Sequence, residues 1–218
     1  MSGLPLFITN DNKYRVGVMM CLLAVALYLP SNHIHLFEPQ MLPMTWVDRW
    51  IPFLPNTVWI YLSEWLFFIS VYIASEDLMN LNKYFYSYVA LQCVSVIIFW
   101  LWPTTYPRTL FPLTPELNPV TNWVFSHLRV MDTPANCAPS LHVSSVYLSS
   151  FIFLDDQKSK LPLFFTWGTA IAISTLTTKQ HYVVDVVSGF LMAAVTYYIF
   201  HRLIPYRIPA PLGAQAKR

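Results

Sequence analysis

The amino-acid sequence predicts an all-α membrane protein with six transmembrane helices, on the basis of its composition, its six apolar segments and the distribution of its basic residues. Of the 218 residues, 56% are hydrophobic and only 11% are charged, whereas soluble domains average about 25% charged residues. The hydrophobic residues number about 122, which is what six membrane spans of ~20 residues consume. This composition argues against a soluble globular enzyme.

Six apolar segments are separated by polar or proline-rich stretches. They cover residues 16–30, 57–74, 84–102, 139–154, 161–177 and 182–204. Lys13 and Arg15 precede the first segment as in a signal peptide, but no small-residue cleavage site follows, so we expect a retained span. In lipid these spans must be helices, because every backbone polar group needs an internal partner. We expect residues 1–218 to form one membrane-embedded domain.

The basic residues predict how the six spans are oriented. Six spans place both termini, and the loops after spans two and four, on one side of the membrane. That side carries nine of the 13 basic residues: Lys13, Arg15, Lys83, Lys158, Lys160, Arg202, Arg207, Lys217 and Arg218. The other side carries four: Arg49, Arg108, Arg129 and Lys179. By the positive-inside rule both termini are cytoplasmic, and the long proline-rich stretch 104–138 lies outside.

The composition also excludes several kinds of binding protein. A net charge of +2 is too small for a nucleic-acid surface, and five glycines leave no Gly-rich nucleotide-binding loop. Three cysteines make no disulfide framework, and only Cys137 lies near a histidine, so neither a zinc site nor any other metal site is expected. We expect Cys137 to be a free thiol. We also expect that the protein needs no cofactor and that membrane lipids surround it.

Polar residues gather at the outer ends of the predicted spans, although they are far apart in the sequence. Arg108 follows the third span, His142 lies near the start of the fourth, and His181 and Asp185 open the sixth. His181 and Asp185 are four residues apart, so they share one face of a helix. A carboxylate that accepts the Nδ1–H of the imidazole leaves Nε2 free as a nucleophile or base.

The second histidine also lies at the start of a predicted helix. His142 follows Pro139, Ser140 and Leu141, and a helix start presents free backbone N–H groups and a positive dipole end, which favour phosphate. Two histidines, a carboxylate, an arginine and Lys179 near a helix N-terminus suit phosphoryl transfer through a phosphohistidine.

The motifs resemble a known family. Residues 139–142 read Pro-Ser-Leu-His, and residues 174–185 read Ser-Thr-x5-His-x3-Asp. With six spans, this pattern resembles the type 2 phosphatidic acid phosphatase superfamily, which shares its site with vanadium-dependent haloperoxidases. That family's motifs are Lys-x6-Arg-Pro, Pro-Ser-Gly-His and Ser-Arg-x5-His-x3-Asp. Here Leu141 replaces the glycine, Thr175 replaces the arginine, and Leu101 stands in the place of the lysine that precedes Arg108.

These departures are similar to the inositol phosphorylceramide synthase and sphingomyelin synthase branch of the superfamily. Bacterial relatives of that branch carry an Asp-x-Pro-x-Asn run before the second motif, here from Asp132 to Asn136. Members of the branch can move a phosphorylated head group between lipids. The resemblance therefore leaves both hydrolysis of a lipid phosphate and transfer to a second lipid open.

The resemblance implies a role for each motif residue. His181 would attack phosphorus, Asp185 would orient it, and His142 would protonate the leaving oxygen and then activate water or an acceptor hydroxyl. Three further side chains would hold the phosphate oxygens: Ser140, Arg108 and Lys179. No metal or cofactor is required. The expected substrate is a lipid phosphate at the outer face of a bacterial inner membrane.

Some interpretations remain open. Glu64, inside the second span, is either a structural acid or a partner of Arg108 or Lys179. Thr175 binds either phosphate or its own helix backbone. The loss of two motif cations also keeps a non-enzymatic transporter or scaffold as the alternative function.

Overall fold

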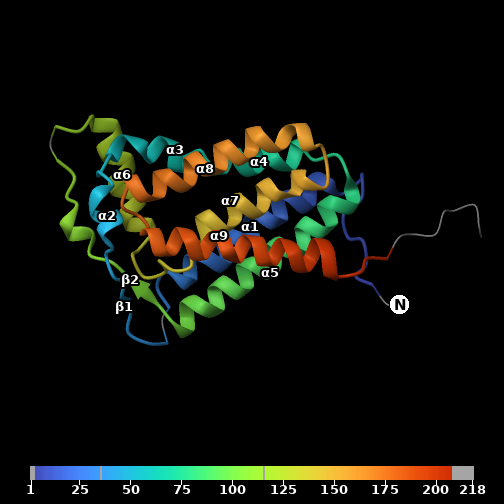
Figure 1. Cartoon of the computed structure of the whole chain (residues 1–218), viewed down its shortest axis with the longest axis horizontal. Helices are drawn as coiled ribbons and strands as arrows, with labels where there is room; N and C mark the ends of the chain where they lie inside the picture. Colours follow the sequence, from blue (N-terminus) through green and yellow to red (C-terminus); the bar gives the residue numbers. More distant parts are fainter. Residues whose placement is uncertain (1–2, 35, 115, 208–218) are drawn as a thin grey trace, which may run out of the picture.

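Each of the six predicted apolar segments is mostly helical in the computed structural model, which describes residues 3–34, 36–114 and 116–207. The helices run lengthwise through the molecule (Figure 1). They are α1 (Lys13–Ser31), α3 (Val58–Leu62), α4 (Glu64–Ala74), α5 (Leu78–Leu101), α7 (Leu141–Phe151), α8 (Leu161–Thr177) and α9 (Val183–Tyr198). The prediction of a mostly helical protein is confirmed. Lys217 and Arg218, used above to orient the spans, lie outside the described residues.

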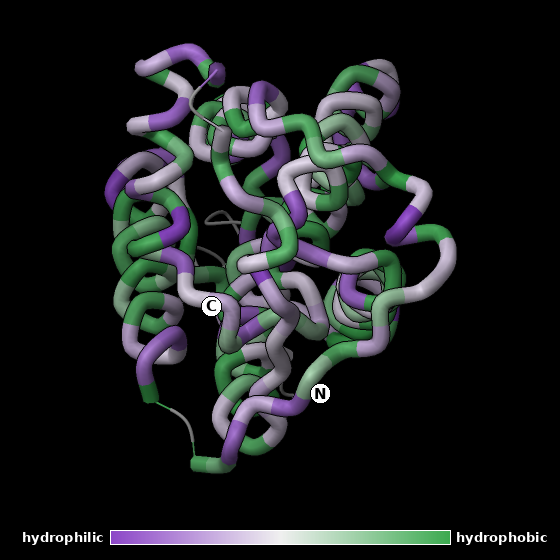
Figure 2. Tube along the Cα trace, turned by 90° about the vertical axis from the view of Figure 1, so that its left-hand side faces the viewer, coloured by the Kyte–Doolittle hydropathy of each residue, from purple (hydrophilic) through white to green (hydrophobic). Residues whose placement is uncertain are grey.

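Four helical segments are long and apolar enough to cross a membrane: Lys13–Ser31, Pro55–Ala74, Leu78–Leu101 and Val183–Leu203. The helices at the outside of the bundle carry hydrophobic residues along their length (Figure 2). Many of these side chains are exposed, among them Leu22, Leu66, Ile97, Leu191 and Val195. Exposed apolar surface of this extent is typical of a surface that contacts lipid. The length and composition of these helices therefore support a membrane protein.

The helix α5 begins earlier than the apolar pattern predicts. Its first turns contain Asn80 and Asn82, which are polar but buried. The side-chain amide of Asn80 donates to the carbonyl oxygen of Ile152, and that of Asn82 donates to the carbonyl oxygen of Ile8. Asp77 caps the helix by accepting from the backbone N–H of Met79. The apolar pattern therefore does not indicate the start of α5, because the first turns carry polar residues that bind other segments.

The helix α7 lies at the centre of the bundle, packed against α4, α5, α8 and α9. Four of its buried residues are serines: Ser144, Ser145, Ser149 and Ser150. Small residues let neighbouring helices approach closely. Gly189 of α9 illustrates this, because a Cβ there would lie 2.6 Å from the carbonyl oxygen of Ser140. The start of α7 therefore lies directly against α9.

Short elements close one end of the bundle (Figure 1). They are α2 (Trp46–Trp50), α6 (Pro119–Met131) and the parallel pair β1 (Gln40–Met41) and β2 (Thr104–Thr105), with a 3₁₀ turn at Arg108–Leu110. The proline-rich stretch 104–138 thus contains a helix that the sequence analysis did not predict. Asn118 caps α6, and Pro119 occupies its first position.

The two ends of the described chain meet at the opposite end of the bundle. The backbone N–H of Leu4 donates to the carbonyl oxygen of Pro205 at 2.9 Å, and the N–H of Arg207 donates to the carbonyl oxygen of Leu4 at 2.9 Å. Both ends therefore lie far from α2 and α6 (Figure 1).

Candidate active site

Two helix N-termini converge at the end of the bundle that α2 and α6 close. The backbone N–H of Ser140, which caps α7, donates to the carbonyl oxygen of Asp185 in the first turn of α9 at 3.1 Å. The Ser140 hydroxyl accepts from the N–H of Val143 at 3.3 Å. The N-termini of the two helices therefore lie side by side, and the positive ends of their dipoles favour an anion nearby.

His181 and Asp185 form the pair that their spacing predicts. His181 Nδ1 lies 3.2 Å from Asp185 Oδ2, and the same oxygen accepts from the backbone N–H of Tyr182 at 2.8 Å. Both side chains are buried. Oδ1 of Asp185 has no partner among the described residues. The carboxylate fixes the orientation of the imidazole and directs its Nε2 away from Asp185.

His142 faces His181 from α7. The two ring centroids are 5.6 Å apart. Nε2 of His142 lies 2.5 Å from the hydroxyl of Tyr61 and 3.5 Å from Oε2 of Glu64. The two histidines that are far apart in the sequence are therefore neighbours, and each has a carboxylate of its own, Asp185 for one and Glu64 for the other.

Arg108 lies at the same end of the bundle and is held by several groups. Its Nη2 donates to Oε1 of Gln180 at 2.6 Å, and its Nη1 donates to the carbonyl oxygens of Arg129 and Asp132. The Asp132 carboxylate lies 3.6 Å from Nη2. Burial alone would lower the pKa of Arg108, but Tyr106 and Asp132 outweigh it and raise the pKa. Arg108 is therefore a permanent cation. It binds Gln180, the residue that directly precedes His181.

Other predicted residues have structural contacts instead. The ammonium of Lys179 donates to the carbonyl oxygens of Asp48 and Ile51 at 2.7 and 2.6 Å, at the end of α2. Burial lowers the pKa of Lys179, against the opposing effect of Asp48. Its charge therefore fixes α2 to the loop that precedes His181. Nothing in these contacts brings the Lys179 ammonium to the two histidines.

Thr175 and Asn136 likewise bind their surroundings. The Thr175 hydroxyl donates to the carbonyl oxygen of Ala172 at 2.7 Å, within its own helix. The Asn136 amide donates to the hydroxyl of Ser31 at 2.9 Å and to Oδ1 of Asn32 at 3.2 Å, which joins the end of α1 to the segment before α7.

Glu64 pairs with neither of the two cations considered from the sequence. Arg108 is engaged by Asp132, and Lys179 by main-chain oxygens, which leaves the other interpretation of Glu64, that of a structural acid. Sequence spacing missed the actual partner, His142, because the two residues lie on different helices and meet only through packing of α4 against α7.

The sequence analysis also did not identify two tyrosines and one glutamine at the site. Tyr28 donates to the Asp132 carboxylate, and the Tyr61 hydroxyl lies 3.5 Å from it. Gln180 is 2% exposed and directly precedes His181. Only Tyr61 left a usable signal, because it stands three residues before Glu64 and so lies on the same face of the segment.

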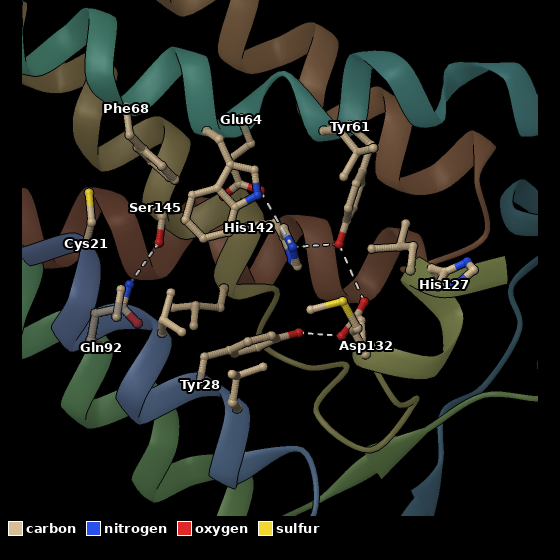
Figure 3. A pocket seen from close by; sticks show the side chains of 18 of the residues that line it. Cys21, Tyr28, Tyr61, Glu64, Phe68, Gln92, His127, Asp132, His142 and Ser145 are labelled. Carbon is tan, nitrogen blue, oxygen red and sulfur yellow. Dashed lines mark hydrogen bonds and ion pairs between the residues drawn. The ribbon is translucent and has the colours of Figure 1, made fainter. Parts of the chain in front are cut away.

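A cavity of about 550 Å³ opens beside His142 (Figure 3). Its wall is mainly apolar and comes from α1, α3, α4, α5, α6 and α7. The apolar lining residues include Phe68 and Trp65 of α4 and Val124 and Leu128 of α6. Its polar groups include His142, Glu64, Tyr61, Tyr28 and Asp132. This combination of an apolar wall with a few convergent polar groups is typical of a ligand site.

One comparison with known proteins found a match. A family model described as the PAP2 superfamily matches residues 37–199, which include His142, His181 and Asp185. No curated protein and no solved structure was found to match the chain. Among the described residues, no group of three or more His, Cys, Asp or Glu side chains is arranged to hold a metal ion.

Proposed function

Since this chain belongs to the PAP2 superfamily, we propose that it is an integral membrane enzyme that cleaves or transfers the phosphate group of a lipid phosphate through a phosphohistidine at His181. The observation that carries this proposal is the position of the His181–Asp185 pair opposite His142, which lines an apolar cavity. Membership of the family supports phosphatase-type phosphoryl transfer, and the apolar cavity supports a lipid substrate.

The reaction has two steps. His181 attacks phosphorus through Nε2, the bond from phosphorus to the lipid oxygen breaks, and His142 gives a proton to that oxygen. In the second step water or an alcohol attacks the phosphohistidine, His142 accepts its proton, and the bond from phosphorus to nitrogen breaks. Asp185 retains the Nδ1–H hydrogen bond and stabilises the positive charge on the His181 ring.

The positive groups at the site would hold the phosphate oxygens. Arg108 and the N-termini of α7 and α9 supply them, and Ser140 supplies a hydroxyl and the turn from which α7 begins. We retain Lys179 as a weaker candidate, because its ammonium would have to leave the carbonyl oxygens of Asp48 and Ile51.

The proposed membrane topology has six spans, both termini in the cytoplasm and the site at the outer face. Hydrogen bonding between Leu4 and residues 205–207 supports an even number of crossings, because both chain ends lie at the end of the bundle away from the site. The excess of basic residues on that side supports the orientation. A bacterial inner membrane, with the site facing the periplasm, is the proposed location.

Whether the acceptor is water or a lipid alcohol is set by the branch of the family. The Pro-Ser-Leu-His motif and the Asp132–Asn136 run favour the inositol phosphorylceramide synthase-like branch, and hence transfer. Asp132 contacts both Tyr28 of α1 and Arg108, and so connects α1 to the site. These contacts support a role for the Asp132–Asn136 run. Hydrolysis of a lipid phosphate or diphosphate is the second candidate reaction.

The test uses detergent-purified protein on a panel of lipid phosphates, with and without added lipid alcohols, and His181→Ala as the matched control. Mass spectrometry reads free phosphate and new lipids from the same samples. We expect products that require His181: free phosphate for hydrolysis, or new head-group lipids that increase with the alcohol for transfer. If neither product depends on His181, the proposal is wrong, and a transporter or scaffold becomes the better interpretation.

A further inference from the structure

The side-chain amide of Gln180 has one bound end and one free end. Its Oε1 accepts from Nη2 of Arg108 at 2.6 Å and from the hydroxyl of Tyr106 at 3.5 Å. A guanidinium has only N–H donors, so the end of the amide that faces Arg108 is the oxygen. Nε2 is the other end, and it is buried without a hydrogen-bond partner among the described residues. Buried donors are nearly always paired in native proteins, so this group requires an explanation.

The loop between α8 and α9 holds Gln180 directly beside the proposed nucleophile. The carbonyl oxygen of Thr175 accepts from the backbone N–H groups of Gln180 at 2.9 Å and of His181 at 3.1 Å. Lys179, which precedes them, adopts the left-handed conformation with a φ of 55°. One fixed turn therefore carries both Gln180 and His181. Since both ends of the amide belong to one group, Nε2 also lies within a few ångströms of the Arg108 guanidinium that binds Oε1.

Few side-chain donors remain for a phosphoryl group at His181, whose charge spreads over three oxygens. Thr175 stands in the place of the motif arginine, but its hydroxyl donates to the carbonyl oxygen of Ala172. The ammonium of Lys179 is bound to carbonyl oxygens near α2. Nη1 of Arg108 is likewise turned to carbonyl oxygens. A free N–H donor next to Arg108 and His181 therefore lies where the phosphoryl group needs one.

Resting on the proposed function, we propose that Gln180 is a catalytic residue whose Nε2 donates a hydrogen bond to a non-bridging oxygen of the transferring phosphoryl group, while its Oε1 stays on Arg108. A hydrogen bond to a charged oxygen is stronger than one between neutral groups, and it strengthens further as charge develops in the transition state. The buried donor is then paired only when phosphate is bound, which favours the bound state.

A second unpaired donor near His181 has different surroundings. The hydroxyl of Tyr182 also lacks a partner among the described residues. Its side chain, however, belongs to an apolar cluster with Leu42, Cys137 and Ala138, and its ring lies 5.2 Å from that of Tyr106. Gln180 differs because a phosphate-binding candidate, Arg108, fixes the orientation of its amide.

Gln180→Met tests the proposal by removing the amide at nearly constant side-chain length. With the lipid phosphate identified by the panel, we expect kcat/KM to fall by about 10²-fold, as for loss of one preorganised donor. The inhibition constant of orthovanadate, which mimics five-coordinate phosphorus, should rise by about tenfold or more. Gln40→Met is the matched control, since Gln40 is exposed in β1, and it should change both values by less than about twofold. Wild-type values in a folded Gln180→Met protein overturn the inference.

Gln180→Glu separates a contact with phosphate from support of Arg108. A carboxylate keeps an oxygen for the Arg108 guanidinium and strengthens that pair, but it has no N–H to donate. We expect this variant to lose at least as much orthovanadate affinity as Gln180→Met, with an unchanged thermal unfolding midpoint in detergent. Wild-type orthovanadate affinity in Gln180→Glu would show that Gln180 only holds Arg108, which contradicts the inference.

Because Gln180→Glu also adds a negative charge, a double-mutant cycle with Arg108→Met provides the uncharged comparison. If Gln180 acts only through Arg108, Gln180→Met has no further effect once the guanidinium is absent. We expect instead a further loss of orthovanadate affinity of about tenfold. No further loss overturns this inference and leaves the proposed function intact, provided that wild-type turnover requires His181. Absence of any His181-dependent turnover across the lipid panel overturns both.

Discussion

Replacing His181 by asparagine should abolish turnover, with a loss of about 10⁴-fold or more, because no other group would form the covalent intermediate. The fold should survive, since asparagine keeps a polar group next to Asp185. Product formation from the lipid phosphate identified by the panel measures the activity. The thermal unfolding midpoint in detergent measures the fold.

His33→Ala is the matched control for this variant. His33 is exposed, and it lies at the same end of the bundle as the site, just after α1. Its replacement should change turnover by less than about twofold, as for a surface substitution away from the site. Normal turnover in a correctly folded His181→Asn protein would show that another residue carries the phosphate.

Replacing His142 by alanine should slow turnover of lipid substrates by about 10²–10⁴-fold, the range for loss of a general acid–base group. The loss should depend on the leaving group, because His142 supplies a proton that an alkoxide needs and a p-nitrophenolate does not. With p-nitrophenyl phosphate the first step should therefore proceed nearly at the wild-type rate, and a burst of p-nitrophenol should precede slow turnover. Stopped-flow absorbance measures both phases.

A uniform loss would argue against this role. If His142→Ala slows the burst with p-nitrophenyl phosphate as much as it slows the lipid reaction, His142 binds the phosphate instead of transferring a proton. Tyr61→Phe is the companion variant, because the Tyr61 hydroxyl lies 2.5 Å from Nε2 of His142. It should retain the burst and lose only part of the steady-state rate.

The features of the site that the sequence predicted are local ones. His181 and Asp185 meet because four residues bring two side chains onto one face of a helix, wherever that helix lies. The start of α7 beside His142 was predicted from a similarly local pattern, the Pro-Ser-Leu-His segment. The sequence also predicted helices for the six apolar segments, because apolar segments of this length must be helical in lipid.

The features that the sequence did not predict depend on packing between distant segments. Glu64 meets His142, and Arg108 meets Gln180, only after helices from different parts of the chain assemble. Lys179 looked available for phosphate because the docking of α2 onto the loop before His181 leaves no local signal. The amphipathic helix α6 was hidden within a stretch whose prolines and polar residues resemble a loop, although it forms one wall of the cavity.

The central claim is a covalent phosphate on His181, and trapping that intermediate tests it most directly. Purified protein is mixed with the lipid substrate, quenched in alkali, where phosphohistidine is stable, and digested for mass spectrometry. We expect a phosphate adduct on the peptide that contains His181, more of it in His142→Ala because breakdown is slowed, and none in His181→Asn. Substrate turnover with no adduct on His181, or an adduct of equal amount in His181→Asn, would contradict the account.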